Sequence, residues 1–318
     1  MRPAPLRTQR GVAVITALLL TTLAVTIVAS LFWQQQVQVR SIENQRLQLQ
    51  SEWIMRGALD WAALILREDA KFSNADTLDE PWAVPLAETR LDQYVDDGQA
   101  DSDVADATLS GNISDAQARY NLANLCTNGI IDPVEVAVFA KLLGNSGLDP
   151  ALAQATADLM AKAQAKPEAA SANNAGQADQ TGSQPMNPAQ VDDLLAVPGF
   201  SPQMLDRIRD LVIFLPRPTS VNVNTAPAEV LAARIAALSL SDAAALVASR
   251  KTASFRDMAD FSNRLQGKLL NTPANQLSVA TNYFLVNGKV HMSRAGLKML
   301  ALIERNAANT RLIWIREN

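Results

Sequence analysis

One long apolar run dominates the start of the chain. Residues 12–33 contain no charged side chain over 22 positions, and the ten residues before Gly11 carry three arginines and no acid. At 1.5 Å of rise per residue, such a run forms roughly 33 Å of helix, which is enough to cross the hydrocarbon core of a bilayer. The arginines predict that the N-terminus stays in the cytoplasm and that the rest of the chain is exported.

The helical pattern continues past the apolar run. Residues 34–70 contain no proline and a single glycine, Gly57, so nothing in them breaks a helix. We therefore predict one helix of more than 50 residues, half in the membrane and half outside. A coiled coil is the alternative, but the heptad is not sustained. The apolar residues that recur at helical spacing are Ile42, Leu49, Trp53, Leu59 and Leu66.

The middle of the chain is predicted to be mostly helical. Two helices are expected over 134–143 and 150–163, separated by a turn at 144–147. Residues 165–190 are of low complexity and cannot bury enough apolar surface to fold, so we expect a loop there. A further helical block covers 191–270. It begins as a helix, a Pro198-Gly199 hairpin and a second helix up to Leu215, and another helix runs through Ile235.

Strand character is expected at two places that lie far apart in the chain. Residues 118–122 form an early strand, and residues 283–292 form a hairpin with Asn287-Gly288 as its two-residue turn. Two more strands are expected over 293–305 and 311–316. The span 297–303 fits a helix equally well by periodicity, and we prefer a strand because the hairpin needs partners.

Charge and rare residues narrow the possible chemistry. The net charge of −4 argues against a general polyanion binder. Residues 72–110 hold ten acids against Arg90 alone, which predicts a solvated loop between Ser73 and Ser110, with calcium binding or a basic partner as alternatives. The one cysteine, Cys126, cannot form an internal disulfide, and with the one histidine, His291, it cannot make a structural zinc site. We expect His291 in a core or on a sheet surface, and no enzymatic activity.

Three hypotheses fit the N-terminus: a secretory signal peptide, a plain signal anchor and a type IV prepilin leader. The apolar run is longer than a signal peptide needs, and a plain anchor gives no role to Gly11. The stretch Arg10-Gly11-Val12 resembles the prepilin signal, a short basic leader that ends in glycine. The resemblance implies that prepilin peptidase removes residues 1–11 by cutting between Gly11 and Val12, and that Val12 is then methylated.

The fifth residue counted from Val12 is Thr16, where most pilins and pseudopilins have glutamate. A carboxylate inside a membrane is costly unless it is paired, and in that family it pairs with the terminal amine of a neighbouring subunit. Thr16 cannot form this ion pair. The K-type minor pseudopilin of the type II secretion system departs from the pattern in this way, and it is thought to sit at the filament tip.

Three further motifs resemble the same family, the general secretion pathway protein K family. They are Asp115 followed by Arg119-Tyr-Asn-Leu-Ala-Asn-Leu, the Val-Pro198-Gly199 turn, and Asn222-Val-Asn-Thr-Ala-Pro. The resemblance implies an α+β, type IV pilin-like fold: a long N-terminal helix and a small antiparallel sheet with a large inserted all-α, helix-hairpin-helix/SAM-like domain. The implied divisions are a leader (1–11), a transmembrane helix (12–33), its periplasmic continuation (34–70), a pilin-like part (71–122 and 275–318) and an inserted domain (123–274).

The resemblance also implies a role and partners. The role is that of a minor pseudopilin at the tip of the pseudopilus, which starts assembly and supports protein export across the outer membrane. The partners are the I- and J-type minor pseudopilins, the major pseudopilin, prepilin peptidase and the inner-membrane assembly platform. The protein is expected in the bacterial inner membrane with a single pass and a periplasmic globular part. Calcium is implied for the globular part, without assigned ligands.

The alternative function is a membrane-anchored DNA receptor of the competence type, because helix-hairpin-helix repeats also bind DNA. Such repeats hold a phosphate with the backbone amides of a Gly-x-Gly turn and nearby basic side chains. Here the first hairpin lacks the second glycine, and Pro202 has no amide to donate. The second is expected at 238–242, where there is no glycine and Asp242 would repel phosphate. We therefore do not expect a nucleic-acid partner.

Overall fold

The structure is a computed structural model of the 318-residue chain, and it describes residues 10–91, 107–165, 185–265, 273, 276–292, 295–307 and 309–317. The chain divides into two compact units. The first comprises Met1–Arg56, Arg90–Thr108 and Val290–Leu297. The second comprises Gly57–Thr89, Leu109–Lys289 and Lys298–Asn318.

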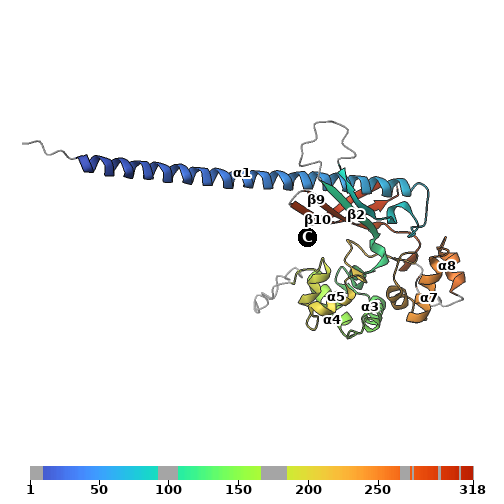
Figure 1. Cartoon of the computed structure of the whole chain (residues 1–318). Coiled ribbons are helices and arrows are strands. Elements are labelled where there is room, and N and C mark those ends of the chain that lie inside the picture. Colours follow the sequence, from blue (N-terminus) through green and yellow to red (C-terminus); the bar gives the residue numbers. More distant parts are fainter. Residues whose placement is uncertain are drawn as a thin grey trace, which may run out of the picture. The chain divides into compact units, whose positions relative to one another are not determined.

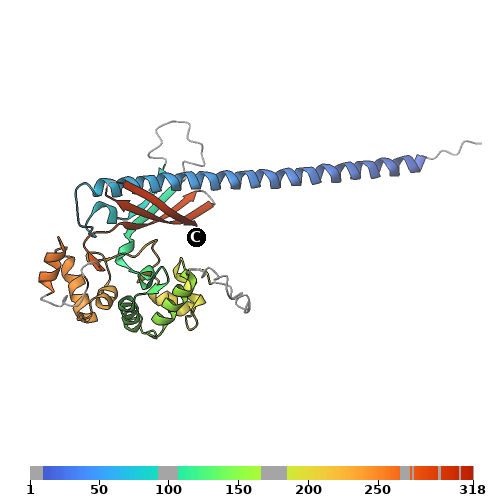
Figure 2. The same cartoon turned by 180° about the vertical axis from the view of Figure 1, so that it is seen from behind.

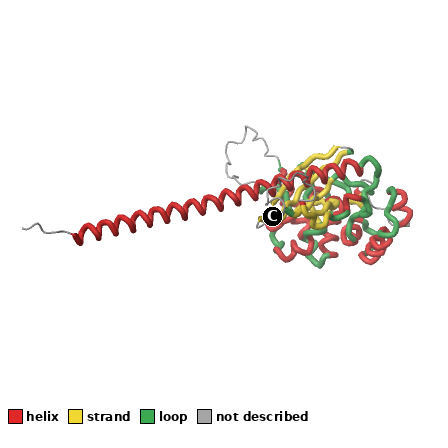
Figure 3. The backbone as a smooth tube through the Cα atoms, turned by 45° about the horizontal axis from the view of Figure 1, so that its top comes forward, coloured by secondary structure: helices red, strands yellow, loops and turns green. Residues whose placement is uncertain are grey.

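The N-terminal helix is continuous, as the sequence pattern predicts. α1 (Arg10–Asp69) runs for 60 residues without a break (Figure 3). In the first unit it buries Leu47 and Met55, and Leu47 packs with Ala107 and Met292. In the second unit its buried positions are Leu59, Ala62 and Leu66, again at helical spacing.

The apolar residues that recur at helical spacing in α1 do not all lie on one face. Leu59 and Leu66 are buried, but Ile42, Leu49 and Trp53 are 64%, 56% and 68% exposed. At 100° per residue, these three residues lie on the side of the helix opposite Leu47. The regular spacing in the sequence therefore includes residues from two faces of the helix. Among the described residues, only one of these faces is buried within the chain.

A five-stranded sheet lies along the last turns of α1 (Figures 1 and 2). Its strand order is β1-β2-β9-β10-β11. The two strands expected near the C-terminus are present and antiparallel, with a register shift between Leu302 and Ile303. The expectation of an unbroken loop over 73–110 is wrong, because β1 and the start of β2 lie within it. The strands are β1 (Leu86–Arg90), β2 (Thr108–Asp115), β9 (Tyr283–Met292), β10 (Ala295–Asn306) and β11 (Asn309–Glu317).

The two Asn-Gly pairs of the chain behave differently. Asn287 and Gly288 do not turn the chain but lie within the single strand β9, so the predicted hairpin there is wrong. Asn128 and Gly129 have φ values of 54° and 81° and connect β4 (Cys126–Thr127) to β5 (Ile130–Ile131) as a tight hairpin. The extended surroundings of Asn287 outweigh its local turn preference, because β9 is paired in the middle of the sheet.

A helical block separates β2 from β9 in the chain. The two helices predicted within 132–164 are present, and the helix after Pro227 ends within one residue of its predicted end. Residues 166–184 of the predicted loop lie outside the described residues, and 185–190 form neither helix nor strand. The α-helices of the block are α3 (Pro133–Asn145), α4 (Leu152–Gln164), α5 (Pro202–Ile208), α6 (Ala228–Arg234), α7 (Leu240–Arg250) and α8 (Met258–Arg264).

Two predictions inside this block need correction. The helix expected up to Leu215 ends at Ile208, because Val212 and Ile213 form β6 and pair in parallel with β3 (Tyr120–Asn121). The early strand expected over 118–122 is therefore only β3, and it lies outside the five-stranded sheet. The remaining short elements are η1 (Pro81–Ala83), η3 (Ala116–Ala118), η4 (Leu122–Leu125), η5 (Val191–Ala196), β7 (Val221–Asn222) and β8 (Leu277–Ser278).

Substitution of Gly199 by alanine tests the packing of the Pro-Gly turn. Gly199 has a φ of +106°, and a Cβ built on it would lie 2.8 Å from Leu152 Cδ2 on α4. We expect Gly199→Ala to lower the free energy of unfolding by about 1–3 kcal/mol. The control is Gly144→Ala in α3, where the nearest contact is 3.7 Å, and it should be neutral or stabilising by up to about 1 kcal/mol. Urea unfolding of the detergent-solubilised chain measures both, and equal effects would contradict the packing role.

Candidate functional site

The predicted processing residues lie in the first turns of α1. The Thr16 hydroxyl donates to the carbonyl oxygens of Val12 and Ala13, at 3.0 Å in each case. This internal bonding satisfies a polar side chain inside an apolar helix without any partner subunit. The described residues contain one helix that is long and apolar enough to cross a membrane, within Val12–Asp69. Cleavage between Gly11 and Val12 and methylation of Val12 stay predictions.

The exposed stripe of α1, Ile42, Leu49 and Trp53, forms an apolar surface within the first unit. Arg56 lies over the Trp53 ring at 5.7 Å from the ring centroid, one helical turn further along. A stripe of this kind, at spacings of seven and four residues, suits packing against another helix.

The motif residue Asp115 is the centre of a buried polar network in the second unit. Its Oδ1 accepts from the backbone amide of Gln117 and from the Thr281 hydroxyl, at 2.7 Å each. Its Oδ2 accepts from Asn222 Nδ2 at 2.9 Å and from the Thr225 hydroxyl at 2.6 Å. Burial raises the pKa of Asp115, and the donors from Thr225, Thr281 and Asn222 act in the opposite direction.

Arg305 on β10 continues this network to the end of α1. Its guanidinium donates to Asp69 Oδ2 at 2.8 Å, to the Leu66 carbonyl at 3.3 Å and, at shorter range, to Asp76. It also lies over the Phe284 ring at 4.6 Å. Burial raises the pKa of Asp76 and of Asp69, against the effect of Arg305. The helix end, the sheet and the β8–β9 connection are thereby tied together.

The asparagines of the two motifs also make internal connections. Asn121 Nδ2 donates to the Arg217 carbonyl at 2.8 Å, and Asn124 exchanges two hydrogen bonds with the backbone of Thr219. Asn224 exchanges two with the backbone of Phe255. Because all three asparagines are buried, these motifs hold loops in place and are not available to a ligand.

The α6–α7 turn, where the DNA-receptor hypothesis needs its second phosphate site, is filled by the chain itself. Lys141 Nζ on α3 donates to the carbonyls of Ile235 and Ala236 at 3.1 Å and of Leu238 at 3.3 Å. The amide of Asp242 is capped by the Ser239 hydroxyl at 3.1 Å. The ammonium group of Lys141 is thus bound to the carbonyls of the turn, and the turn itself carries the acid Asp242.

One cluster of three acids among the described residues has the spacing of a metal site: Asp69, Asp76 and Glu80. Arg305 already binds the first two, and Glu80 Oε2 accepts from the Thr77 amide at 2.9 Å and from Trp82 Nε1 at 2.7 Å. A divalent cation would have to displace these donors, so this cluster does not fit the calcium implied by the family resemblance. The acids between residues 92 and 106 lie outside the described residues.

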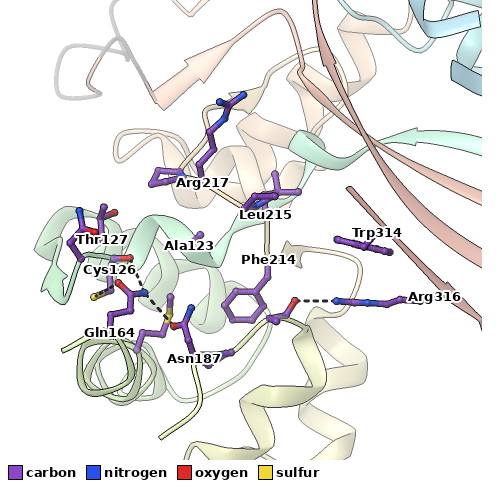
Figure 4. Close-up of a pocket in the computed structure, with 16 residues that line it drawn as sticks. Ala123, Cys126, Thr127, Gln164, Asn187, Phe214, Leu215, Arg217, Trp314 and Arg316 are labelled. Carbon is purple, nitrogen blue, oxygen red and sulfur yellow. Dashed lines mark hydrogen bonds between the residues drawn. The ribbon is translucent and has the colours of Figure 1, made fainter. Parts of the chain in front are cut away.

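A hollow of about 350 Å³ lies between the end of α4, β4 and β11 (Figure 4). Gln164 donates to the Cys126 carbonyl at 3.4 Å and to Asn187 Oδ1 at 3.3 Å, while Arg316 donates to the Ala189 carbonyl at 3.3 Å and stacks on Trp314. The described residues that line it include no histidine and no carboxylate side chain. This arrangement offers no acid–base pair.

The two rare residues take structural positions. Cys126 is 3% exposed, burial raises the pKa of its thiol, and it is free. A buried thiol with a raised pKa is a poor nucleophile. His291 is exposed on β9, which matches the expected sheet-surface position.

The chain begins with a long continuous helix whose first half is apolar and whose last turns pack on a small sheet. A helical block separates the second and third strands of this sheet in the chain. This arrangement defines a pilin-like α+β protein with one candidate membrane-spanning helix among the described residues. Two family models, both described as type II secretion system (T2SS), protein K, match residues 118–217 and 221–280, which is half of the chain. The chain belongs to this family of minor pseudopilins.

Relatives and a solved structure agree with this assignment. Type II secretion system protein K of Pseudomonas aeruginosa is 28% identical over 312 residues, covering 94% of this chain and 90% of that protein. The Klebsiella pneumoniae protein of the same name is 27% identical over 318 residues, covering 93% of each. A chain of the GspK–GspI–GspJ complex of the type 2 secretion system from enterotoxigenic Escherichia coli has the same fold, with a TM-score of 0.65 and 21% identity, covering 88% of this chain and 99% of that one.

Sequence reasoning named Asp115 as a motif residue but missed what it does. It also missed Thr281, Arg305 and Lys141, which lie outside every motif. The only local signal for Asp115 is an acid at the end of a strand, directly before an N-cap-like turn. Nothing local marks Arg305, because its partners lie more than 200 residues earlier in the chain.

Replacing Asp115 with asparagine should separate the connected segments. An amide has one acceptor oxygen in place of two, so at least two of the four donors lose their partner in a buried place. We expect Asp115→Asn to reduce the free energy of unfolding by about 2–3 kcal/mol. The matched control is Asp79→Asn, at an exposed acid, which should change it by less than about 0.5 kcal/mol. Urea unfolding monitored by near-UV circular dichroism measures both variants. If Asp115→Asn leaves the free energy of unfolding unchanged, the network does not contribute substantially to the stability of the fold.

Proposed function

We propose that this protein is the minor pseudopilin that occupies the tip of the type II secretion pseudopilus. There it would initiate pseudopilus assembly and so support protein export across the outer membrane. The role is structural, without catalysis. Membership of the protein K family supports the assignment as a minor pseudopilin. The proposed tip position rests on one observation, the hydrogen bonding of the Thr16 hydroxyl within its own helix.

Thr16 suits a subunit with nothing above it. In a filament shaft, a glutamate at this depth is paired with the terminal amine of an adjacent subunit, and without that partner it costs on the order of 3 kcal/mol at the helix centre. The Thr16 hydroxyl is bonded to carbonyls of its own helix, so it needs no partner. A tip subunit has no neighbour above it to supply one.

The stripe of Ile42, Leu49 and Trp53 is the surface on which we expect partner helices. These side chains are exposed and apolar, and they follow the apolar run that anchors the chain. A related structure is a GspK–GspI–GspJ complex, so the I- and J-type minor pseudopilins are the first candidates. The major pseudopilin and the inner-membrane assembly platform are further partners.

The expected location follows from the N-terminal charges. Arg2, Arg7 and Arg10 keep the leader in the cytoplasm, so the chain would cross the inner membrane once and place its globular part in the periplasm. Prepilin peptidase would then cut between Gly11 and Val12 on the cytoplasmic side. The DNA-receptor alternative is disfavoured, because Lys141 occupies the turn that would hold a phosphate.

A bulky residue at Gly11 should block processing. The peptidase requires a residue without a side chain next to the scissile bond, so we expect Gly11→Leu to accumulate uncleaved in the inner membrane and exoprotein release to fall. The control is Gly57→Leu in the same helix, where a Cβ meets nothing within 4 Å, and it should be cleaved normally. N-terminal sequencing of the membrane-extracted proteins gives the result. Normal cleavage of the Gly11 variant would exclude the prepilin assignment.

Substitutions at Thr16 test the tip position. Thr16→Val should leave pseudopilus length and exoprotein release close to wild type, because the lost hydroxyl bonded only to its own helix. Thr16→Glu should not improve secretion, and it should let the protein enter the shaft, where its large head obstructs growth. Thr22→Val, which removes a similar internal bond to Leu19, is the matched control. If Thr16→Val abolishes secretion as completely as deletion of the protein while Thr22→Val does not, Thr16 makes an essential contact and the tip argument fails.

A further inference from the structure

The last strand of the chain, β11, is one of the two edges of the five-stranded sheet. It runs for nine residues and contains no proline. Within the described part of the chain, its backbone forms no backbone hydrogen bond to any segment other than β10. An edge strand leaves the N–H and C=O groups of alternate residues unpaired, and natural sheets usually keep such edges short or interrupt them. The long, uninterrupted edge of β11 therefore suits pairing with a strand from another chain.

One face of β11 exposes apolar side chains. Leu312 and Ile315 pair with Ile303 and Ala301 of β10, both of which are buried. Leu312 is nevertheless 47% exposed and Ile315 38% exposed, since no described strand lies beyond them. A neighbouring strand would bring its own side chains to about 5 Å from each of these residues. An apolar side chain at such a position would cover this surface.

The other face of β11 is cationic. The pairing register places Trp314 and Arg316 there, and the Arg316 guanidinium lies 4.2 Å from the centroid of the Trp314 ring (Figure 4). Among the described residues, the hydrogen-bond acceptor of Arg316 is the Ala189 carbonyl, at 3.3 Å, and not a carboxylate. The nearby acid Asp192 is bonded through both of its oxygens to Arg209, at 2.7 and 3.1 Å. Arg316 therefore retains donors for an acid from outside.

The same face carries more arginine than acid. Glu304, on β10, accepts from Arg217 at 2.5 Å, from the Tyr283 hydroxyl at 3.1 Å and pairs with Arg311 at 3.2 Å. Two guanidinium groups thus already share this carboxylate, and Arg316 follows further along β11. The excess of positive charge favours a strand with acidic side chains on this face, because opposite charges on neighbouring strands attract.

We propose that β11 accepts an extended segment of a partner protein as an additional strand of the sheet. Its acidic side chains would face Arg316, and its β-branched apolar side chains would cover Leu312 and Ile315. Successive residues of a strand point to opposite faces, so a segment that alternates acidic and apolar residues meets both requirements. A second copy of the chain is a poorer occupant, because β11 carries Arg311 and Arg316 against Glu317 alone, and pairing two copies would bring like charges together. The proposal does not depend on the tip position or on leader cleavage.

The test uses the full chain in lipid nanodiscs and fluorescein-labelled heptapeptides, read by fluorescence anisotropy. The probe is Thr-Val-Asp-Val-Asp-Val-Thr. Two control peptides carry lysine in place of both aspartates or serine in place of the three valines. We expect saturable binding of the probe, weakened roughly tenfold by either change. Equal binding of all three peptides, or equal binding of the probe to nanodiscs without protein, would overturn the proposal.

Methylated peptides test whether the main chain pairs. Neighbouring residues of a strand direct their N–H groups to opposite edges, so N-methylation of the valines blocks one edge of the probe and N-methylation of the aspartates blocks the other. Only one edge can lie against β11. We therefore expect one methylated peptide to bind like the probe and the other to bind roughly tenfold more weakly. Equal binding of the two would contradict strand addition.

Protein variants locate the binding on β11. Arg316→Glu should weaken the probe roughly tenfold and allow the lysine peptide to bind, whereas Lys251→Glu, at the exposed end of α7, should change neither. Leu312→Thr combined with Ile315→Thr should weaken the probe roughly fivefold. The matched control is Ile130→Thr, at a 75% exposed isoleucine of β5, which should bind the probe fully. Circular dichroism melting of each variant checks its fold.

Two outcomes with these variants would overturn the proposal. If Arg316→Glu melts like the unsubstituted chain, still binds the probe fully and does not bind the lysine peptide, β11 is not the site. If size-exclusion chromatography shows a dimer that the Leu312→Thr and Ile315→Thr substitutions dissociate, the occupant of the edge is a second copy of the chain and not a partner segment.

Discussion

The buried carboxylate of Asp115 is the constraint on which the second unit depends. An acid out of water is stable only if donors surround it, and here the four donors come from the turn after β2, the motif at 222–225 and the segment before β9. Asn222 and Thr281 also bond Asp76, which Arg305 links to the end of α1. Each of these segments must therefore be in place before the others are satisfied. A chain that interrupts a small sheet with a long helical block needs such a joint, because the block could otherwise pivot about its two connections.

The long helix carries two apolar faces with different purposes. One face, which includes Leu59 and Leu66, is buried within the chain, and the other, with Ile42, Leu49 and Trp53, is left to solvent. Exposing three large apolar side chains in one stripe is costly for a protein that works alone and reasonable for a subunit of an assembly. At the apolar end of the helix, the Thr16 hydroxyl donates to a carbonyl of its own helix, so it requires no partner subunit. Under the proposed function, the helix combines a membrane anchor, a support for the sheet and a surface for other subunits.

The helical block resembles a DNA-binding scaffold but uses the same features for packing. Gly199 has the positive φ of a hairpin glycine, yet the space it leaves is taken by Leu152 of α4. Lys141 satisfies three carbonyls of the α6–α7 turn, and burial lowers the pKa of its ammonium. Arg250 is held by the carbonyls of Val223 and Thr225, and burial lowers its pKa to about 10. Cations that could face a phosphate in such a scaffold are instead directed into the protein.

The sequence alone determined the features that depend on local order: the uncharged run, the unbroken helix to Asp69, the helices around Gly144 and the family motifs. Only the tertiary structure decided which face of α1 is buried, which of the two Asn-Gly pairs turns, and that residues 86–90 become an edge strand. The reason is distance along the chain. Three of the four donors to Asp115 lie 107 to 166 residues away in the chain, and Asn287 stays extended because β9 pairs with β2, which is distant in sequence, as well as with β10. The local pattern of a segment shows which secondary structures it is able to form. Pairing with distant segments decides which of these structures it adopts.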